Sequence, residues 1–379
     1  MNKKEINELR RRWKPDKNAV SRLYGCFVNG NREIVADLDE SLGMMPQEEA
    51  EKYLNLLKKV LSGALGKNLL DIVFTTEQVT EGAEHKLLME LKTSELKDNQ
   101  TRQKFYQKVI QSLDMGESSY LLLMASDCYD VPRKSSDVMR SSDSDEVFSY
   151  FLCAVCPVKT EKTELGYFSG DNEFHCSANQ VVAAPELGFL FPAFDDRSAN
   201  IYNALFYSRK ADELHHEFID AVFHTDPPMP AAEQREVFEG VLAEALGDSF
   251  NLDSIRAIHE QLTAKIDAHL ETKDPEPPTV SAHEIGDILL NCGITEKQAE
   301  AFRALCGERF GSGTVLNPAN LIDTKKAELK TERFSISIDP EYSYLLETKV
   351  LDGRKVLIVP VEDHVEFNGV AVAVDADKA

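Results

Sequence analysis

Four aspartates stand shortly after two apolar segments of the chain, and acids in such places could bind a metal ion. Asp127 and Asp130 follow the first segment, while Asp195 and Asp196 follow the second. Carboxylate oxygens are preferred ligands of Mg²⁺ and Mn²⁺, and these ions support phosphoryl and phosphodiester chemistry. If both segments are neighbouring strands that run in the same direction, their acids meet at one edge of the sheet. This arrangement would suit a metal-dependent phosphoesterase or nuclease.

Arg197 follows the second acidic pair immediately and gives those acids a different role. A guanidinium this close in sequence can form a structural ion pair with Asp195, Asp196 or Glu186. Loop acids that contact only water are a third interpretation, because the chain is rich in acidic residues. The residue types leave all three roles open, so Arg197 belongs to the same set of candidate site residues.

Cys153 and Cys156 form a Cys-x-x-Cys pair, and His175 with Cys176 would complete a four-ligand zinc set by residue type. Geometry disfavours this zinc site, because residues three apart in a strand face opposite sides of the sheet. Reactive or redox-active thiols are a second interpretation. The pattern favours a third one, in which Cys153 and Cys156 are buried structural residues.

Residues 1–22 contain eight Lys or Arg against three acidic residues, so this segment is net positive. Ile6, Leu9 and Trp13 have near-helical spacing, and Pro15 follows as a stop signal. We expect a short amphipathic helix that Trp13 docks on the protein. The alternative is an arm that binds an acidic protein partner or nucleic acid.

Short buried strands are the elements that must position the candidate residues. Four apolar segments predict a central sheet, namely 120–125, 147–155, 181–184 and 187–194. The clearest helix covers 46–65, which has one continuous apolar stripe. Segment 201–207 has helical spacing but also fits a strand. Segment 135–146 is rich in Ser and Asp and reads as a mobile loop by composition.

The C-terminal part predicts a helix pair followed by strands. Helices are expected at 281–291 and 295–308, and Gly293 between them gives the pair the form of a helix-turn-helix. The second helix has a near-neutral charge, which makes it poorly suited to bind in the major groove of DNA. Beyond residue 334 the apolar period becomes two, and Asp352-Gly353 predicts a hairpin turn.

Together these patterns predict a mixed α+β fold. A central sheet of short strands is flanked by helices, a helical middle follows, and an antiparallel meander forms the C-terminal part. We expect three segments: an α/β domain over 1–226, a helical segment over 227–273, and the helix pair with its meander over 274–379. A chain of 379 residues is long enough for more than one core.

The composition bounds the partners and the compartment. A formal net charge of −23 repels phosphate backbones and anionic membrane surfaces at long range, so nucleic-acid binding would need a local basic patch. Seven scattered cysteines do not suggest a disulfide framework, and no segment approaches the roughly 18 apolar residues of a membrane span. We therefore expect a soluble cytoplasmic protein that does not bind membranes.

Several short motifs also carry a family resemblance. They are Tyr24-Gly25-Cys26, Met45-Pro46-Gln47-Glu48-Glu49-Ala50, Tyr129-Asp130-Val131-Pro132, Cys156-Pro157-Val158, and the stretch from Gly188 through Arg197 with Asn200-Ile201-Tyr202-Asn203. By these motifs the chain resembles, over nearly its full length, an uncharacterised bacterial family known as a domain of unknown function. The resemblance implies a bacterial cytoplasmic origin and brings no activity with it.

The order of the predicted parts, ending in Ile358-Val359-Pro360, is also similar to the bacterial nucleoid-associated family. This similarity concerns the fold level alone. No Walker-type glycine loop, Gly-x-Ser-x-Gly or His-Glu-x-x-His motif occurs in the chain. The sequence therefore favours a non-enzymatic binding or regulatory protein, with association with the nucleoid or with nucleic acid as its most specific form. The alternative is the Mg²⁺- or Mn²⁺-dependent enzyme that uses the clustered aspartates.

Overall fold

The computed structural model describes two compact units of the chain. The described residues are 1–372 without 15, 16, 18, 132–146, 169, 171, 227, 248–251, 273–275, 312, 324, 325, 331–333, 339–341, 343, 344, 352, 361–364, 368 and 369. Unit 1 comprises Met1–Gln234 with Asp274–Pro277, and unit 2 comprises Arg235–Lys273 with Pro278–Ala379. The finer division into three segments stays a prediction, and the expected loop 135–146 lies outside the described residues.

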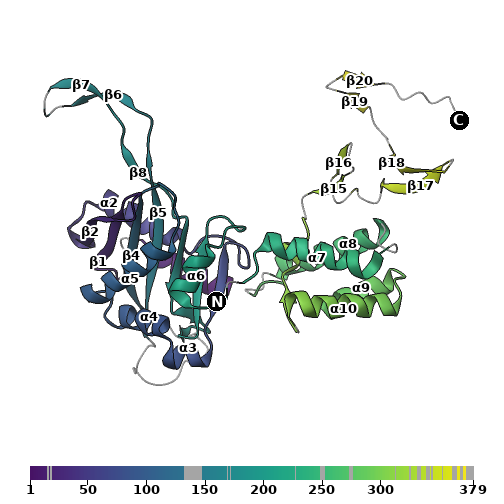
Figure 1. The fold of residues 1–379 in the computed structure, drawn as a ribbon, viewed down its shortest axis with the longest axis horizontal. Helices are drawn as coiled ribbons and strands as arrows, with labels where there is room; N and C mark the ends of the chain where they lie inside the picture. The colour runs from purple at the N-terminus through teal and green to yellow at the C-terminus, as the bar shows by residue number, and fades with distance from the viewer. Residues whose placement is uncertain are drawn as a thin grey trace. The chain divides into compact units, whose positions relative to one another are not determined.

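Unit 1 is built around one antiparallel sheet (Figure 1). Its strands are β1 (Arg22–Val28), β2 (Ile34–Ser41), β3 (Leu69–Val73), β4 (Tyr120–Asp130), β5 (Val147–Thr160), β6 (Glu164–Phe168), β7 (Glu173–Ser177), β8 (Gln180–Val182), β9 (Leu187–Phe191), β10 (Ala193–Asp195), β11 (Ser198–Asn200) and β12 (Asn203–Ser208). Its helices are α1 (Lys3–Arg12), η1 (Leu42–Met44), α2 (Gln47–Lys59), α3 (Thr76–Glu81), α4 (Ala83–Thr93), α5 (Asn99–Ser112) and α6 (His216–Phe223).

The main sheet has the order β2-β1-β4-β5-β9-β12-β3, and β8 also pairs with β5. Helices α1 and α2 pack on one face, while α4, α5 and α6 pack on the other. Strands β4 and β9 both run antiparallel to β5, which lies between them. They therefore point in the same direction, but they are not the neighbouring strands that the metal hypothesis required.

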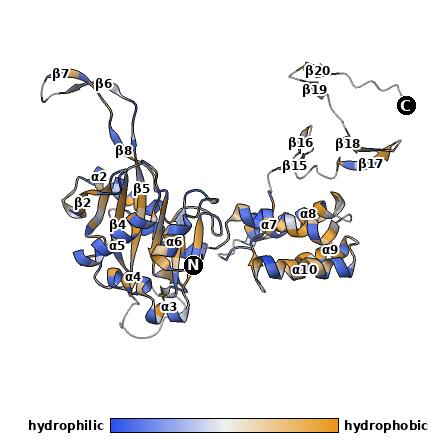
Figure 2. Ribbon diagram, in the orientation of Figure 1, coloured by the Kyte–Doolittle hydropathy of each residue, from blue (hydrophilic) through white to orange (hydrophobic). Residues whose placement is uncertain are grey.

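Alternation along each strand divides the core into two layers. Phe151 and Cys153 of β5 lie in the α4–α6 layer, while Leu152 and Ala154 lie in the α1–α2 layer. Successive side chains point to opposite faces, and both faces are covered, so the central strands read as continuous apolar runs. Figure 2 shows these strands in hydrophobic colours and the helices with hydrophilic outer residues.

The mixed α+β class is confirmed, and the strands expected at 120–125 and 147–155 are present as β4 and β5. Segment 187–194 divides into β9 and β10, and segment 181–184 contributes to β8, which is exposed and pairs with β5. The helix expected over 46–65 begins after Pro46 as predicted but ends at Lys59. Strands β1 and β2 have no counterpart among our expectations from the sequence. Segment 201–207, which fitted either period, enters strand β12 and pairs with both β9 and β3. The chain after Arg197 therefore continues as a strand, and the helical interpretation of that segment is wrong.

Unit 2 is a small helical body with its own core. Its elements are α7, which spans Ala231–Leu246 and begins in unit 1, α8 (Leu252–Thr272), β13 (Val280–Ser281), α9 (Ala282–Asn291), α10 (Glu296–Phe310), β14 (Val315–Leu316) and α11 (Pro318–Leu321). Ser281 with Glu284 and Thr295 with Gln298 form capping boxes that start α9 and α10, and Gly293 between the helices has a φ of +84°. The predicted helix pair is therefore present.

Three hairpins follow the helices. They are β15 (Ala327–Lys330) with β16 (Ser335–Ile338), β17 (Glu347–Leu351) with β18 (Arg354–Ile358), and β19 (Val365–Phe367) with β20 (Val370–Val372). The strands are antiparallel as expected, but in the part of the chain that the structure describes each hairpin forms a separate two-stranded sheet. Within that part, no helix is long and apolar enough to cross a membrane.

Candidate functional site

Asp127, the first candidate aspartate, lies near the end of β4 and is buried. Arg12 of α1 donates to both of its carboxylate oxygens, with Nε–Oδ2 and Nη2–Oδ1 distances of 3.0 and 3.1 Å. The backbone N–H of Ala19 donates to Oδ1 at 2.8 Å, and the hydroxyl of Tyr150 donates to Oδ2 at 2.8 Å. Four hydrogen bonds therefore hold this carboxylate in place, and the two from Arg12 join opposite charges.

Arg12 is held as closely as its partner. Its Nη2 also donates to the carbonyl of Cys128 at 2.9 Å, and its guanidinium lies 4.3 Å from the ring centroid of Tyr129. Burial opposes the charge of Arg12, but the hydrogen bond and the charge of Asp127 outweigh that effect and raise the pKa of Arg12. Asp127 and Arg12 therefore form a charged pair that pins the end of α1 to the sheet.

Trp13 completes this contact from the apolar side. It is buried, and its Nε1–H donates to the hydroxyl of Tyr150 at 3.2 Å. Burial, together with the nearby Asp127, raises the pKa of Tyr150 well above its ordinary value, so this phenol stays protonated. The expectation that Trp13 docks an N-terminal helix is confirmed.

Arg197 lies in the turn between β10 and β11 and also contacts α1. Its Nη1 donates to both carboxylate oxygens of Glu8, at 3.2 and 2.9 Å, and its backbone N–H donates to Glu5 at 3.4 Å. The hydroxyl of Tyr129 donates to Glu8 as well. Burial first, and Glu8 second, raise the pKa of Tyr129 to about 12. An ion pair of Arg197 is thus present, and Glu8 of α1 is a partner that the sequence did not suggest.

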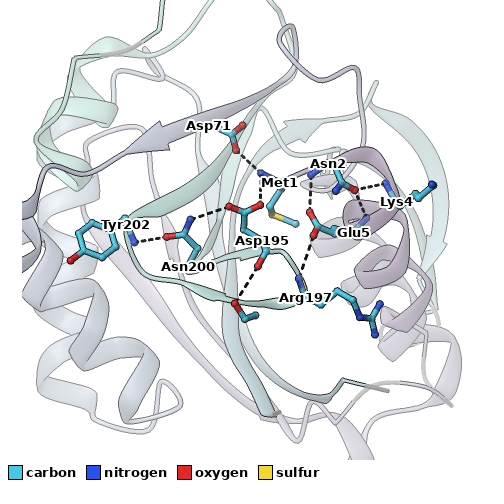
Figure 3. A network of polar contacts seen from close by, with 10 residues as sticks. Met1, Asn2, Lys4, Glu5, Asp71, Asp195, Arg197, Asn200 and Tyr202 are labelled. Carbon is cyan, nitrogen blue, oxygen red and sulfur yellow. Dashed lines mark hydrogen bonds and ion pairs between the residues drawn. The ribbon is translucent and has the colours of Figure 1, made fainter. Parts of the chain in front are cut away.

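Asp195 lies on the opposite side of this turn (Figure 3). It accepts a hydrogen bond from the side-chain amide of Asn200 at 3.1 Å. The amino group of Met1 lies 3.4 Å from Asp71 and 4.0 Å from Asp195. Partial burial raises the pKa of Asp71, and the amino group opposes that rise. Asp195 is therefore part of a local polar network around the start of α1.

The four aspartates are in different surroundings. Asp127 is sealed by its donors, whereas Asp130 and Asp196 are exposed. Across the described ranges, no group of three or more His, Cys, Asp or Glu side chains could hold a metal ion. The expected convergence on Mg²⁺ or Mn²⁺ is therefore corrected, because α1 occupies the place where the two strand ends meet.

The strand ends do share one rim of the sheet, as the sequence suggested. The rings of Tyr129 and Phe194 are 6.0 Å apart, which brings the end of β4 beside β10. Glu8 and Arg12, one helical turn apart on α1, pair with Arg197 and Asp127 respectively. We call this group of four charged residues the α1 rim. Its charges compensate one another, so its chemistry is structural pairing.

The cysteine and histidine candidates are likewise separated. Cys153 and Cys156 are buried in opposite layers of the core, as the strand period requires. Burial raises the pKa of Cys156 to about 12 and the pKa of Cys153 well above its usual range, which suppresses thiolate chemistry. His175 and Cys176 lie exposed on β7, outside the main sheet. The interpretation of two buried structural cysteines fits these positions.

Sequence reasoning missed the residues that complete the α1 rim. The spacing of Glu8 and Arg12 signals that both lie on one helix face, and that much was available from the sequence. Their partners lie 189 and 115 residues away. No local pattern identifies such pairs.

The fold and the rim define an α+β protein in which an N-terminal amphipathic helix seals one end of an antiparallel sheet. The family described as a domain of unknown function (DUF4317) matches residues 1–370, so the chain belongs to that family. This match confirms the resemblance drawn from the short motifs. A search of curated proteins found no match.

Proposed function

We propose that the chain is a non-enzymatic binding protein that contacts polyanions, nucleic acid in particular, through the solvent face of α1. The observation that carries this proposal is how α1 sorts its charges. Glu5 is buried and Glu8 pairs with Arg197, whereas Lys3, Lys4 and Arg11 are exposed. The two acids of α1 therefore face the protein, whereas Lys3, Lys4 and Arg11 face solvent and Arg12 pairs with Asp127.

Helix geometry supports the same division. At about 100° per residue, the exposed cations Lys3, Lys4 and Arg11 project from the side opposite Leu9, which is buried. Lys14 and Lys17, just beyond the helix, are exposed as well. We call Lys3, Lys4, Arg11, Lys14 and Lys17 the cationic face.

The cationic face stands out because of the charge of the whole chain. A net charge of −23 repels phosphates at long range, so contact with nucleic acid is confined to a local positive surface. Lysine and arginine bind phosphates largely without regard to base sequence. The proposed activity is therefore salt-dependent and weakly selective for sequence, and nucleoid association in a bacterial cytoplasm would be its most specific form.

A charge-neutralised variant tests the proposal. The triple variant Lys3→Gln/Lys4→Gln/Arg11→Gln removes three positive charges. Glutamine is a good helix former, so α1 should keep its helical conformation. A variant with Lys59→Gln/Lys86→Gln/Lys104→Gln removes the same charge from exposed sites elsewhere in unit 1. Anisotropy of a labelled DNA duplex, measured over a salt series, gives the slope of log affinity against log salt. We expect the first variant to reduce that slope by about 3 and the second to leave it nearly unchanged.

Two results would remove the proposal. The first is no binding of the unaltered chain even at low salt. The second is an equal loss in both variants, which would show a general charge effect. Trp13, the only tryptophan, reports by its fluorescence whether α1 stays docked in each variant. A loss of binding can thereby be separated from a loss of structure.

A further inference from the structure

The solvent side of α1 carries one narrow stripe of polar side chains. At 3.6 residues per turn, its members lie within about 120° of the helix circumference, on the side opposite the buried Leu9. The members are the exposed Lys3, Lys4 and Arg11 and the half-buried Asn7 and Arg10. We call this set the α1 stripe, and it shares its exposed residues with the cationic face.

The positive charges of the α1 stripe have no counter-ions among the described residues of the protein. Within that part of the chain, the ion pairs of α1 involve Glu8 and Arg12 and none of the cations of the stripe. The Nε–H of Arg10 is buried and has no hydrogen-bond acceptor there. Elsewhere in unit 1 cations are paired, as Lys108 is with Glu84 at 2.9 Å. The stripe therefore keeps charge that an external anion can compensate.

Both ends of α1 are fixed, so the stripe is formed before a ligand binds. Asn2 and Glu5 form a capping box at the first turn. At the last turn Arg12 pairs with Asp127, and Trp13 is buried in the core. A preformed site loses little conformational entropy when it binds a ligand, so a few charge contacts are sufficient for measurable affinity.

The stripe offers contacts to phosphates rather than to bases. Proteins that bind the bases of single strands use exposed aromatic side chains for stacking. Trp13 is the only aromatic residue among residues 1–22, and it is 1% exposed. Side-chain amides read bases by paired hydrogen bonds, but the stripe has a single amide, Asn7, which is half-buried. Lysine binds a phosphate as a point charge, so the stripe favours the backbone of a nucleic acid.

Acidic residues border the stripe on one side. The turn with Asp195 and Asp196 lies beside α1, where the backbone N–H of Arg197 donates to Glu5 (Figure 3). Asp196 is exposed, and the side chain of Asp195 is 48% exposed. The two backbones of a DNA duplex together carry one charge per about 1.7 Å, so a duplex brings a second row of phosphates toward these acids. A single chain of phosphates can follow the stripe, which is about 12 Å long, without that repulsion.

We propose that the α1 stripe binds one chain of phosphates and contacts no bases. The ligand class is a linear chain of phosphates, linked by sugars as in single-stranded nucleic acid or directly as in inorganic polyphosphate. This inference rests on the proposed function and narrows its ligand from polyanions in general to a single phosphate chain.

Three labelled probes of equal length test which part of the ligand is recognised. They are an oligothymidylate, an abasic oligonucleotide with the same number of phosphates, and a duplex. We expect anisotropy titrations of the full chain to give dissociation constants for the first two within about twofold, and the duplex to bind no more tightly. Stacking on a single base would separate the first two by about fivefold or more. Such a separation, or tighter binding of the duplex, overturns the proposal.

Inorganic polyphosphate distinguishes the two sources of phosphate. At matched phosphate concentration it should displace the abasic oligonucleotide from the full chain, because neither ligand has bases. If the labelled duplex binds with the salt dependence expected above but polyphosphate displaces no probe, the single-chain inference is wrong and the proposed function stands. If no probe binds at low salt, both are wrong.

Variants of α1 locate the site and test base reading. The variant that neutralises Lys3, Lys4 and Arg11 should weaken the oligothymidylate and the abasic probe to the same extent, and the three-lysine control variant elsewhere in unit 1 should weaken neither strongly. Asn7→Ala should keep the ratio of the two affinities unchanged. A selective loss of oligothymidylate binding in Asn7→Ala would reveal base reading and contradict the proposal.

Discussion

At the scale of single residues, the Asp127–Arg12 pair is a charge contact in which both partners are held by further hydrogen bonds. The carboxylate is fully buried, and the side chain of Arg12 is 19% exposed. Two buried charges stabilise a fold little compared with an apolar pair, but removal of one of them leaves the other without compensation. The acid that suggested metal chemistry therefore has a structural role that mutation can measure.

Replacement of Asp127 by asparagine should lower the free energy of unfolding by about 3 kcal/mol, because Arg12 keeps its charge and loses its ionic partner. Urea denaturation measures the change. Asp130→Asn is the matched control at the same strand end, and because Asp130 is exposed we expect a change within about 0.5 kcal/mol. Equal losses in both variants would contradict the assigned role.

The buried thiols predict a loss of stability in alkali. Burial raises the pKa of Cys26 and Cys156 to about 12, compared with about 8.5 in an unfolded chain. Above about pH 8.5 the unfolded chain releases these protons while the folded chain retains them. The stabilisation is therefore complete below that pH and is lost as pH rises toward 12.

Urea denaturation between pH 8 and 11 under reducing conditions checks this linkage. In Cys156→Ala the free energy of unfolding should fall less steeply with pH, because unfolding then releases up to one proton fewer. Leu152→Ala, in the same core layer, should lower stability at every pH and leave the slope unchanged. A slope in Cys156→Ala that matches the unaltered chain would disprove the linkage for this thiol.

At the scale of elements, the segment Asp195-Asp196-Arg197 is a hairpin turn. Strands β10 and β11 pair from Ala193 with Asn200 to Asp195 with Ser198, which leaves two residues for the turn. Asp196 and Arg197 have φ of +44° and +62°, the left-handed conformation that a tight two-residue hairpin requires. Asp196, a residue type that tolerates this conformation, and Arg197 are thus the two turn residues, and α1 contacts the turn through the ion pair of Glu8 with Arg197.

Substitutions at Asp196 distinguish a turn residue from a metal ligand. Asp196→Asn should leave unfolding free energy within about 0.5 kcal/mol, because asparagine tolerates the left-handed region as well as aspartate does. Asp196→Val should cost about 1–2 kcal/mol, since a β-branched side chain clashes with that backbone. Chemical denaturation of both variants provides the comparison. A larger loss for asparagine than for valine would show that the carboxylate itself matters.

At the scale of the whole molecule, each compact unit has its own hydrophobic core. Phe189 lies in the core of unit 1, and Phe302 lies in the core of unit 2. Domains with separate cores commonly unfold as separate cooperative units. The chain should therefore show two transitions in calorimetry.

Core truncation in each unit should affect one transition at a time. Phe189→Ala and Phe302→Ala each remove a fully buried ring and should cost about 3–5 kcal/mol in their own unit. Differential scanning calorimetry shows which transition moves. If both variants lower a single common transition, the two units unfold together.

Local pattern was sufficient for many elements of the fold. Strands β4, β5 and β9 were predictable because both of their faces are buried, which makes their sequences continuous apolar runs. The helix after Pro46 was predictable from the apolar stripe along one of its faces. Strand β2 was missed because most of its residues are exposed and three of them are acidic. The apolar residues of segment 201–207 fitted both a helical and a strand period. Its strand conformation depends on pairing with β3 and β9, which no local pattern reveals.

The sequence by itself determined which residues are apolar, which face of α1 is charged, and where acids follow strands. Only the tertiary structure decided that Arg12 meets Asp127 across 115 residues and that Glu8 meets Arg197 across 189. The physical reason is that side-chain periodicity acts over a few residues, whereas the order of β4, β5 and β9 in the sheet sets which distant charges meet.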